Sequence, residues 1–332
     1  MQRTFRWTVV CSTFAVASCA GSTGSVRDDD RTHLSRCASE DERRAVDNRV
    51  RVDECPPGTE LVGTAPPEGT ELACEAEDGT RQGVATVWYP SGTKQSEAHH
   101  EEGKIHGRLV TWYESGAIRE SADYAAGRPH GCSLRWHDGA GLAERGRLAG
   151  GSRTGVWTYW NPSGAKHREG AYHVDRRVSA WLEWTDAGAV VERASYRDGA
   201  LHGAWERTGE NGIRSAGTYR SGKKHGVWRY WLRAGDRETE IRRVEFARGA
   251  EHGPFEQRYH SGAIKERGQF AHGLRDGEWT VYFEDGAVAE RGHYRAGNKR
   301  GAWTAYERDG ETHHVVEYTA TSGEPAAKDS RR

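Results

Sequence analysis

Short stretches of alternating apolar and polar residues recur along the chain. Between residues 279 and 283, for example, Trp, Val and Phe alternate with Thr and Tyr. A period of two is typical of a β-strand, because successive side chains point to opposite faces of a sheet. Both faces of such a strand carry aromatic residues. We therefore expect a single-layer sheet that is solvated on both faces and stabilised by cross-strand aromatic pairs.

Two kinds of glycine-containing segment separate these stretches. The first is a tight turn such as Asn211-Gly212, Asp285-Gly286 or Asp309-Gly310. Asn-Gly and Asp-Gly pairs predict a β-hairpin in which both turn positions have φ > 0. The second is a Gly-x-x-x-Gly segment, which we expect to form a looser turn. Each unit is therefore predicted to be a strand, a tight turn, a second strand and a looser turn.

The unit is repeated at a nearly constant length. The second glycine of the looser segment recurs every 24 residues, apart from one step of 23 and one of 27. The long step carries an insertion near Arg233–Glu240, which we expect to lengthen a turn, and the fifth unit has Ser179 where the glycine should be. At about 4.8 Å per strand, ten two-stranded units would extend for roughly 95 Å. The ten positions are Gly83, Gly107, Gly131, Gly155, Ser179, Gly203, Gly226, Gly253, Gly277 and Gly301.

An aromatic residue follows most of these glycines, and another ends the second strand. The clearest copies are Tyr196-Arg-Asp-Gly-Ala-Leu-His-Gly-Ala-Trp205 and Tyr219-Arg-Ser-Gly-Lys-Lys-His-Gly-Val-Trp228. This pattern resembles the second variant of the membrane occupation and recognition nexus (MORN) repeat over residues 79–310. The resemblance implies an all-β fold: an elongated array of about ten antiparallel β-hairpins that form a single twisted sheet. Many bacterial proteins with this variant are named YwqK-family antitoxins, so it also implies binding or scaffolding, with no enzymatic activity in the repeat itself.

The N-terminal segment is typical of an export signal. Arg3 and Arg6 precede an apolar run over 7–17, which is followed by small residues and Cys19. This order indicates a secretory signal, and the run is shorter than the about 20 residues that span a bilayer. The small residues before Cys19 resemble the lipobox of bacterial lipoproteins. That resemblance implies cleavage before Cys19, diacylation of its thiol and, with Ala20 next, sorting to the outer membrane; an ordinary signal peptide is the alternative.

The remaining segments are divided by composition. Residues 20–54 are polar and dense in charge without apolar periodicity, which is typical of a flexible tether. An open array must protect its two end strands, so we expect a cap at each end. The predicted segments are 1–18 lipoprotein signal peptide, 19–54 tether, 55–78 disulfide-bracketed N-terminal cap, 79–310 repeats, 311–321 C-terminal cap strand and 322–332 disordered tail.

Four cysteines remain outside the signal and the lipidation position. Cys55 and Cys74 bracket a segment rich in Pro and Gly, and we predict that they form a disulfide, which an envelope location permits. Closing a loop of this length would contribute roughly 3 kcal/mol by chain-entropy arguments. Pairing of Cys37 with Cys132 stays open. The sequence has no Cys-x-x-Cys motif, which disfavours a redox motif or a zinc site.

Composition and charge exclude some classes of function. Thirteen Trp and 42 Gly accompany only 35% hydrophobic residues and a mean hydropathy of −0.89. Disordered chains are poor in aromatic residues, so the chain is predicted to fold, but as units that each bury little surface. Basic and acidic residues number 48 and 49 and are interspersed, which disfavours a nucleic-acid partner.

Histidines and carboxylates recur with the period of the repeat. Successive copies would lie about 10 Å apart, which is too far to share one metal ion or to form a catalytic carboxylate pair. We interpret the histidines as turn residues that favour left-handed backbone, and the carboxylates with the arginines after them as solvated positions. We expect no metal, no cofactor and no enzymatic activity, since no catalytic or nucleotide-binding motif occurs. The positions are His106, His130, His202, His225 and His252; Glu120, Glu144, Glu192, Glu266 and Glu290; and Arg145, Arg193, Arg267 and Arg291.

These observations favour a non-enzymatic, envelope-anchored repeat lipoprotein that binds or scaffolds a protein partner. A glycan or a lipid headgroup is a weaker alternative ligand. A second hypothesis is an antitoxin-like protein that neutralises a partner toxin, and an enzyme is the third. The exposed aromatic residues that we predict to bind are Trp157, Trp160, Trp228, Trp231, Trp279 and Trp303.

Overall fold

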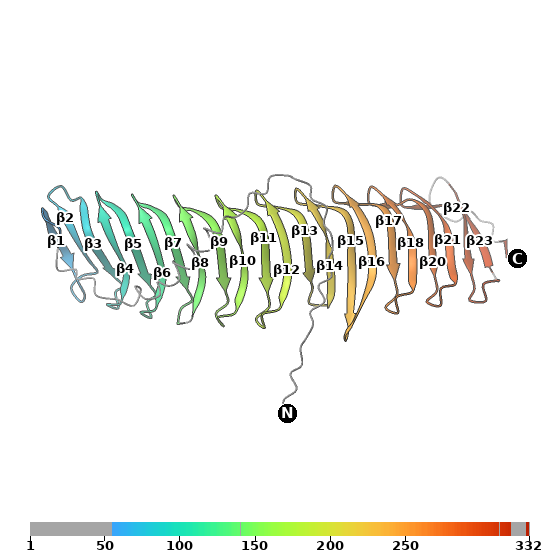
Figure 1. Cartoon of the computed structure of the whole chain (residues 1–332), viewed down its shortest axis with the longest axis horizontal. Helices are drawn as coiled ribbons and strands as arrows, with labels where there is room; N and C mark the ends of the chain where they lie inside the picture. Colours follow the sequence, from blue (N-terminus) through green and yellow to red (C-terminus); the bar gives the residue numbers. More distant parts are fainter. Residues whose placement is uncertain (1–54, 140, 312, 320–329, 332) are drawn as a thin grey trace, which may run out of the picture.

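The computed structural model describes residues 55–139, 141–311, 313–319 and 330–331, and it is an open antiparallel β-sheet (Figure 1). Strands that follow one another in the sequence pair with one another in the sheet, and β18 pairs with both β19 and β20. The predicted all-β array of hairpins is therefore confirmed. The strands are β1 Thr59–Thr64, β2 Glu71–Ala76, β3 Arg81–Trp88, β4 Lys94–Glu101, β5 Lys104–Trp112, β6 Ile118–Ala125, β7 Arg128–Trp136, β8 Leu142–Ala149, β9 Ser152–Trp160, β10 Lys166–His173, β11 Arg176–Trp184, β12 Val190–Arg197, β13 Ala200–Thr208, β14 Ile213–Arg220, β15 Lys223–Ala234, β16 Arg237–Ala247, β17 Ala250–Arg258, β18 Ile264–Ala271, β19 Leu274–Arg275, β20 Gly277–Tyr282, β21 Val288–Arg295, β22 Asn298–Tyr306, β23 His313–Tyr318 and β24 Ser330–Arg331.

The tight and loose turns are the reverse of the prediction. In the Asp-Gly and Ser-Gly turns only the glycine has φ > 0, as at Gly92 (85°) and Gly286 (93°). The Gly92 amide donates to the Tyr89 carbonyl and the Tyr89 amide to the Thr93 carbonyl, which is a longer hairpin loop that ends in a left-handed glycine. The Gly-x-x-x-Gly segment instead holds a two-residue turn with both φ values positive, as at Ser221 (50°) and Gly222 (77°).

A β-bulge follows each two-residue turn and explains the second glycine. Gly83 has φ 80° and Gly203 has φ 102°, and the pairing register shifts opposite such positions. A left-handed bulge residue is normally glycine because a Cβ atom is disfavoured there. Ser179 adopts φ 59° at the same place, so the fifth unit keeps the bulge despite its substitution.

In five units the tryptophan that follows the bulge lies flat on a glycine of the preceding strand. A Cβ atom built on Gly217 would lie 2.4 Å from the Trp228 ring, and one on Gly170 would lie 2.1 Å from Trp181. The Trp228 indole N–H donates to the carbonyl of Thr218, the residue after that glycine (3.2 Å). The glycine therefore makes room for the ring, and the carbonyl next to it satisfies the indole. The same arrangement joins Gly146 to Trp157 and Gly292 to Trp303. Trp279 packs on Gly268 in the same way, but its indole N–H donates to the Glu266 carboxylate at 3.1 Å.

Tyrosine and phenylalanine rings pack edge-on between these tryptophans. Tyr294 lies 5.7 Å from Trp279 and 4.9 Å from Trp303, with interplanar angles of 80° and 77°. Tyr172 is similarly placed 6.3 Å from Trp157 and 5.0 Å from Trp181. We call this side of the sheet the Trp face. Its aromatic contacts form the core of the array, so the expectation that both faces are equally wet is wrong.

The insertion at Arg233–Glu240 lengthens two strands instead of a turn. β15 has 12 residues and β16 has 11, and Ala234 pairs with Arg237. Only Gly235 and Asp236 connect them. This hairpin extends beyond its neighbours along one edge of the sheet (Figure 1).

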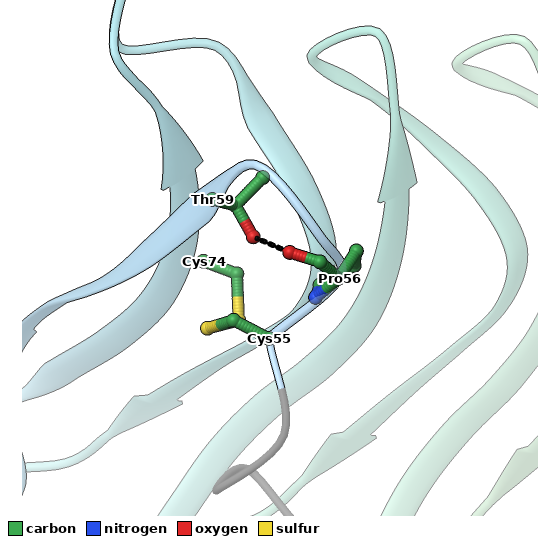
Figure 2. The surroundings of a disulfide bond; sticks show 4 residues. All are labelled: Cys55, Pro56, Thr59 and Cys74. Atoms are coloured by element: carbon green, nitrogen blue, oxygen red, sulfur yellow. Dashed lines mark hydrogen bonds between the residues drawn. A yellow bond between two sulfur atoms is a disulfide. The ribbon is translucent and has the colours of Figure 1, made fainter.

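The N-terminal cap has the predicted disulfide. Cys55 and Cys74 are bonded, with their Cα atoms 5.5 Å apart (Figure 2). The Thr59 hydroxyl donates to the Pro56 carbonyl at 2.7 Å, and the Pro56 ring lies against the bulge at Gly83. The bridge thus ties the residues before β1 to the start of the array.

Other terminal predictions are tested only in part. Cys132 is disulfide-bonded, and its predicted candidate partner Cys37 lies outside the described residues. The signal, Cys19 and the tether also lie outside them. At the other end β23 pairs with β22, and Ser330–Arg331 pair with β23. The C-terminal cap strand and the disordered tail stay predictions.

We predict that Gly217→Ala destabilises the array by about 1–3 kcal/mol, as overpacking typically does. The added methyl would meet the Trp228 ring, whereas a Cβ on Gly141 meets nothing within 4 Å. Gly141→Ala is therefore the matched control and should unfold like wild type. Urea denaturation followed by Trp fluorescence checks this, and equal stability of both variants would contradict the packing.

We also predict a pH dependence that originates at His100. Its side chain is 8% exposed, and burial, with the Arg81 charge, lowers its pKa below the usual value of 6.5. The unfolded chain therefore takes up the proton first as pH falls. Stability is complete above about pH 6.5 and decreases below it.

His100→Gln should reduce this loss of stability between pH 7 and 5, and His99→Gln should not, because His99 is exposed. Thermal denaturation across this range measures it. The same pH profile in wild type and His100→Gln would refute the assignment.

Candidate functional site

Four of the six predicted binding tryptophans are structural. Trp157, Trp228, Trp279 and Trp303 are buried on the Trp face, at 3% exposure or less. Cations cover three of these rings: the Lys224 Nζ lies 4.1 Å from the Trp228 ring centre, the Arg275 Cζ 4.2 Å from that of Trp279, and the Lys299 Nζ 3.9 Å from that of Trp303. The expectation that these four are exposed is therefore wrong, because each ring fills the space above a glycine.

The other two, Trp160 and Trp231, belong to a row on the opposite face. They lie three residues after Trp157 and Trp228 on the same strands, and strand alternation puts them on the other side. Most members lie at the end of a strand before the longer turn, whereas Trp231 lies three residues before the end of β15. All members but the buried Trp112 are half-buried. We call it the second aromatic row: Trp88, Trp112, Trp136, Trp160, Trp184, Trp231, Tyr282 and Tyr306.

Most members of the second aromatic row have a cation above the ring from a neighbouring strand. Three of these cations are Arg145, Arg267 and Arg291, which the sequence analysis interpreted as solvated positions. Cation–π contacts at exposed sites contribute about 0.5–1 kcal/mol each. The distances to the ring centre are 5.5 Å for Lys94 and Trp112, 5.4 Å for Arg145 and Trp160, 5.0 Å for Lys166 and Trp184, 3.7 Å for Arg214 and Trp231, 5.4 Å for Arg267 and Tyr282, and 5.5 Å for Arg291 and Tyr306.

Hydrogen bonds at the turns fix the spacing of this row. The Tyr89 hydroxyl donates to the Trp112 carbonyl (2.9 Å), and the Tyr113 hydroxyl to the Trp136 carbonyl (2.8 Å). His137 takes the place of the tyrosine in the next unit, with its Nε2 3.0 Å from the Trp160 carbonyl. Each turn is thereby held to the aromatic residue of the following repeat. The sequence analysis missed these residues, although an aromatic residue directly before the turn is visible as a signal.

The charges around Trp231 form a small network. The Arg214 guanidinium, stacked on the ring, contacts Glu238 at 2.7 Å and Glu206 at 3.0 Å. The hydrogen bond from Arg214 lowers the pKa of Glu238 below its usual range. The ring is thus surrounded by charges of both signs that are already paired, which fixes the orientation of the guanidinium.

A shallow cleft of about 530 Å³ lies further along the array, between β16 and β20. Arg243, Glu256, Arg267 and Glu278 line it, so its charges are mixed and balanced. Arg243 is paired with Glu240 at 2.8 Å. The cleft offers polar contacts along the sheet without a concentration of one charge.

The repeated histidines do not have the backbone conformation that we expected. His106, His202 and His225 lie on strands just before the bulge, and their φ values are not positive; only His272, in a two-residue turn, has φ 55°. His252 stacks near His272 at 5.5 Å. In the part of the chain that the structure describes, no group of three or more His, Cys, Asp or Glu side chains is placed to hold a metal ion.

Comparison with known proteins supports the repeat type. The family model described as a MORN repeat variant matches residues 275–296, which cover β20 and β21. No curated protein matches the chain significantly.

Two solved structures show only weak similarity. A crystal structure described as TcdB2-TccC3-Cdc42 is 10% identical, with a TM-score of 0.17, and the match covers 79% of this chain and 16% of that one. A putative 6-phosphogluconolactonase from Bacteroides fragilis is 12% identical, with a TM-score of 0.14, and the match covers 82% of this chain and 94% of that one. Neither similarity supports an argument about fold or function.

No helix in the described segments is long and apolar enough to cross a membrane. The match at 275–296 covers the bulge at Gly277, Trp279 and the turn at Gly286. Residues 275–296 therefore resemble a MORN repeat variant and lie within an open array of β-hairpins.

Proposed function

We propose that this protein is a non-enzymatic binding or scaffold module that docks a protein partner on the second aromatic row. The observation that carries the proposal is the repeated pairing of a half-buried aromatic ring with a cation from a neighbouring strand, seen at Trp160, Trp184 and Trp231. The row follows the length of the sheet at a spacing fixed by the turns. A partner would therefore meet several equivalent contacts in register.

The chemistry of the row is suited to a protein surface. Trp, Tyr and Arg dominate the energetics of protein interfaces, where a rigid ring is buried and a guanidinium makes directed hydrogen bonds. Small-molecule sites are usually enclosed and apolar, whereas this face is open. Its mixed charge disfavours a polyanion such as nucleic acid. MORN repeats are often protein-binding modules, which agrees with the match at 275–296.

The proposal includes an anchor at Cys19, which rests on the sequence of the leader. Labelled palmitate and cell fractionation test it with wild type and Cys19→Ala. Acylated wild type in the outer membrane, with the variant unlabelled and released, supports an envelope scaffold. Unlabelled wild type in the cytosol would overturn the anchor and favour the antitoxin-like alternative, in which the same face holds a toxin.

To test the docking surface, a photo-cross-linking residue at position 231 captures the partner in intact cells. The partner is then purified and its binding to variants is measured. We predict that Trp231→Ala weakens the purified partner's binding by at least about tenfold, as loss of an interface hot spot does. Circular dichroism should stay as in wild type, because the ring is half-buried and lies outside the Trp face.

Two controls make the result specific. Trp228→Ala should lower the melting temperature because that ring is fully buried. Glu210→Ala, in an exposed turn, should change neither binding nor stability. If Trp160→Ala, Trp184→Ala and Trp231→Ala all bind the partner as wild type does, the second aromatic row is not the interface.

A further inference from the structure

A column of mostly charged residues crosses the Trp face, with one residue in each unit. In the fifth unit, for example, it is Arg168, two residues before the Gly170 on which Trp181 packs. In six of the ten units this position is glutamate, and in the fifth and eighth it is arginine. Because this position recurs once in each unit, a change of its charge in one unit marks a local difference in the Trp face. The ten positions are Glu71, Ser96, Glu120, Glu144, Arg168, Glu192, Ser215, Arg242, Glu266 and Glu290.

The residue facing this column on the next strand compensates its charge in several units. Arg81 contacts Glu71 at 2.7 Å, Arg275 contacts Glu266 at 3.1 Å, and Lys299 pairs with Glu290. In the eighth unit both signs are exchanged, and Arg242 pairs with Glu251. The facing positions are Arg81, Ile105, Pro129, Arg153, Arg177, Leu201, Lys224, Glu251, Arg275 and Lys299.

The fifth unit breaks this rule. Arg168 and Arg177 are the one pair of like charge among the ten. In the register Arg168 lies opposite Glu183 and Arg177 opposite Tyr172. Both guanidinium groups lie over the same ring: their Cζ atoms are 6.0 Å and 4.6 Å from the centre of Trp181. Two cations held at one ring repel each other unless an anion lies between them.

A pocket of about 460 Å³ opens at this position on the Trp face. Its lining contains four arginines, Arg153, Arg168, Arg176 and Arg177, and one carboxylate, that of Asp175. Arg153 is engaged by Asp175 at 2.9 Å, so the remaining three guanidinium groups have no carboxylate within the lining to balance them. The pocket therefore has a concentrated positive charge in a chain whose net charge is −1.

The Arg168 guanidinium has one long carboxylate contact and one nitrogen without a hydrogen-bond partner, so it can accept a ligand. Its closest carboxylate is Glu183 at 3.8 Å, and its Nε is buried without a hydrogen-bond partner. Tyrosine hydroxyls complete the lining. Arg177 donates to the Tyr196 hydroxyl at 3.2 Å, and the Tyr159 hydroxyl donates to that of Tyr172 at 3.3 Å.

We propose that this pocket, between β9 and β12, binds a tetrahedral oxyanion, namely a phosphate or sulfate group. Guanidinium groups bind such groups through paired hydrogen bonds, and tyrosine hydroxyls add neutral donors. The anion lies between Arg168 and Arg177 and adds negative charge to the long contact of Glu183 with Arg168 (3.8 Å). The site is independent of the protein interface on the opposite face.

The experiment uses the repeat to design the variant. Arg168→Glu introduces the residue that six other units have, so we expect it to fold. It also removes the contact with Glu183, so its stability without ligand is measured beside that of wild type. Arg220→Glu is the control, because it makes the same charge change at an exposed residue at the end of β14. Inorganic phosphate and sulfate are titrated by calorimetry at constant ionic strength, and melting temperatures are measured in parallel.

We expect saturable binding and a raised melting temperature for wild type and Arg220→Glu, and affinity at least about tenfold weaker in Arg168→Glu, since a cation has become an anion. Should Arg168→Glu lack native circular dichroism, Arg177→Gln gives the same comparison. Equal binding by wild type and a folded pocket variant overturns the proposal.

The same phosphate chemistry can be presented free or on a lipid headgroup. Vesicles of phosphatidylcholine, with and without phosphatidylglycerol, distinguish these sources in a flotation assay. Flotation with the anionic vesicles that is lost in Arg168→Glu assigns the pocket to a headgroup, and phosphate binding without flotation assigns it to a small anion. Failure of wild type to bind phosphate, sulfate and anionic vesicles would overturn the proposal.

Discussion

The packing of one indole ring on one glycine is the interaction on which the rest of the structure depends. A single-layer sheet has no second layer to bury its aromatic residues, so it must bury them against its own backbone. A glycine such as Gly217 provides the flat surface, and the Thr218 carbonyl accepts the Trp228 indole N–H. The bulge at Gly226 comes just before that ring, and its left-handed backbone increases the local twist of the strand. Edge-on tyrosines then connect one tryptophan to the next within two aromatic clusters, one from Trp157 to Tyr196 and one from Trp205 to Tyr318.

This arrangement leaves the two faces of the sheet with different roles. The Trp face is the core, and cations such as Lys299 cover it from solvent. Most rings of the opposite face are half-buried and are covered by a cation from a neighbouring strand, as Arg214 covers Trp231. A binding surface on this face can therefore vary without loss of the fold. A substitution on the Trp face, by contrast, changes the packing of two repeats.

Much of the fold was predictable from the sequence because it is local and repeated. The period of two, the hairpins and the Cys55–Cys74 bridge follow from spacing and residue type, and the structure confirms them. The types of the two turns were not predictable, since Asp-Gly permits both a two-residue turn and a longer loop that ends in left-handed glycine. The roles of the tryptophans were also hidden. Trp157 and Trp160 are the same residue type on the same strand. Trp157 is the one that packs on a glycine of the adjacent strand, Gly146. The Arg168–Arg177 pair is visible in the sequence only after the strand register is known.

Hydrogen exchange of the indole N–H groups tests this account most directly. The account predicts slow exchange for Trp157, Trp181, Trp228 and Trp303, whose N–H groups donate to backbone carbonyls at 3.1–3.2 Å, and fast exchange for the half-buried Trp160 and Trp231. NMR with assigned indole signals separates the two sets. Uniform exchange across all six indoles would contradict the division of the sheet into a packed face and a binding face.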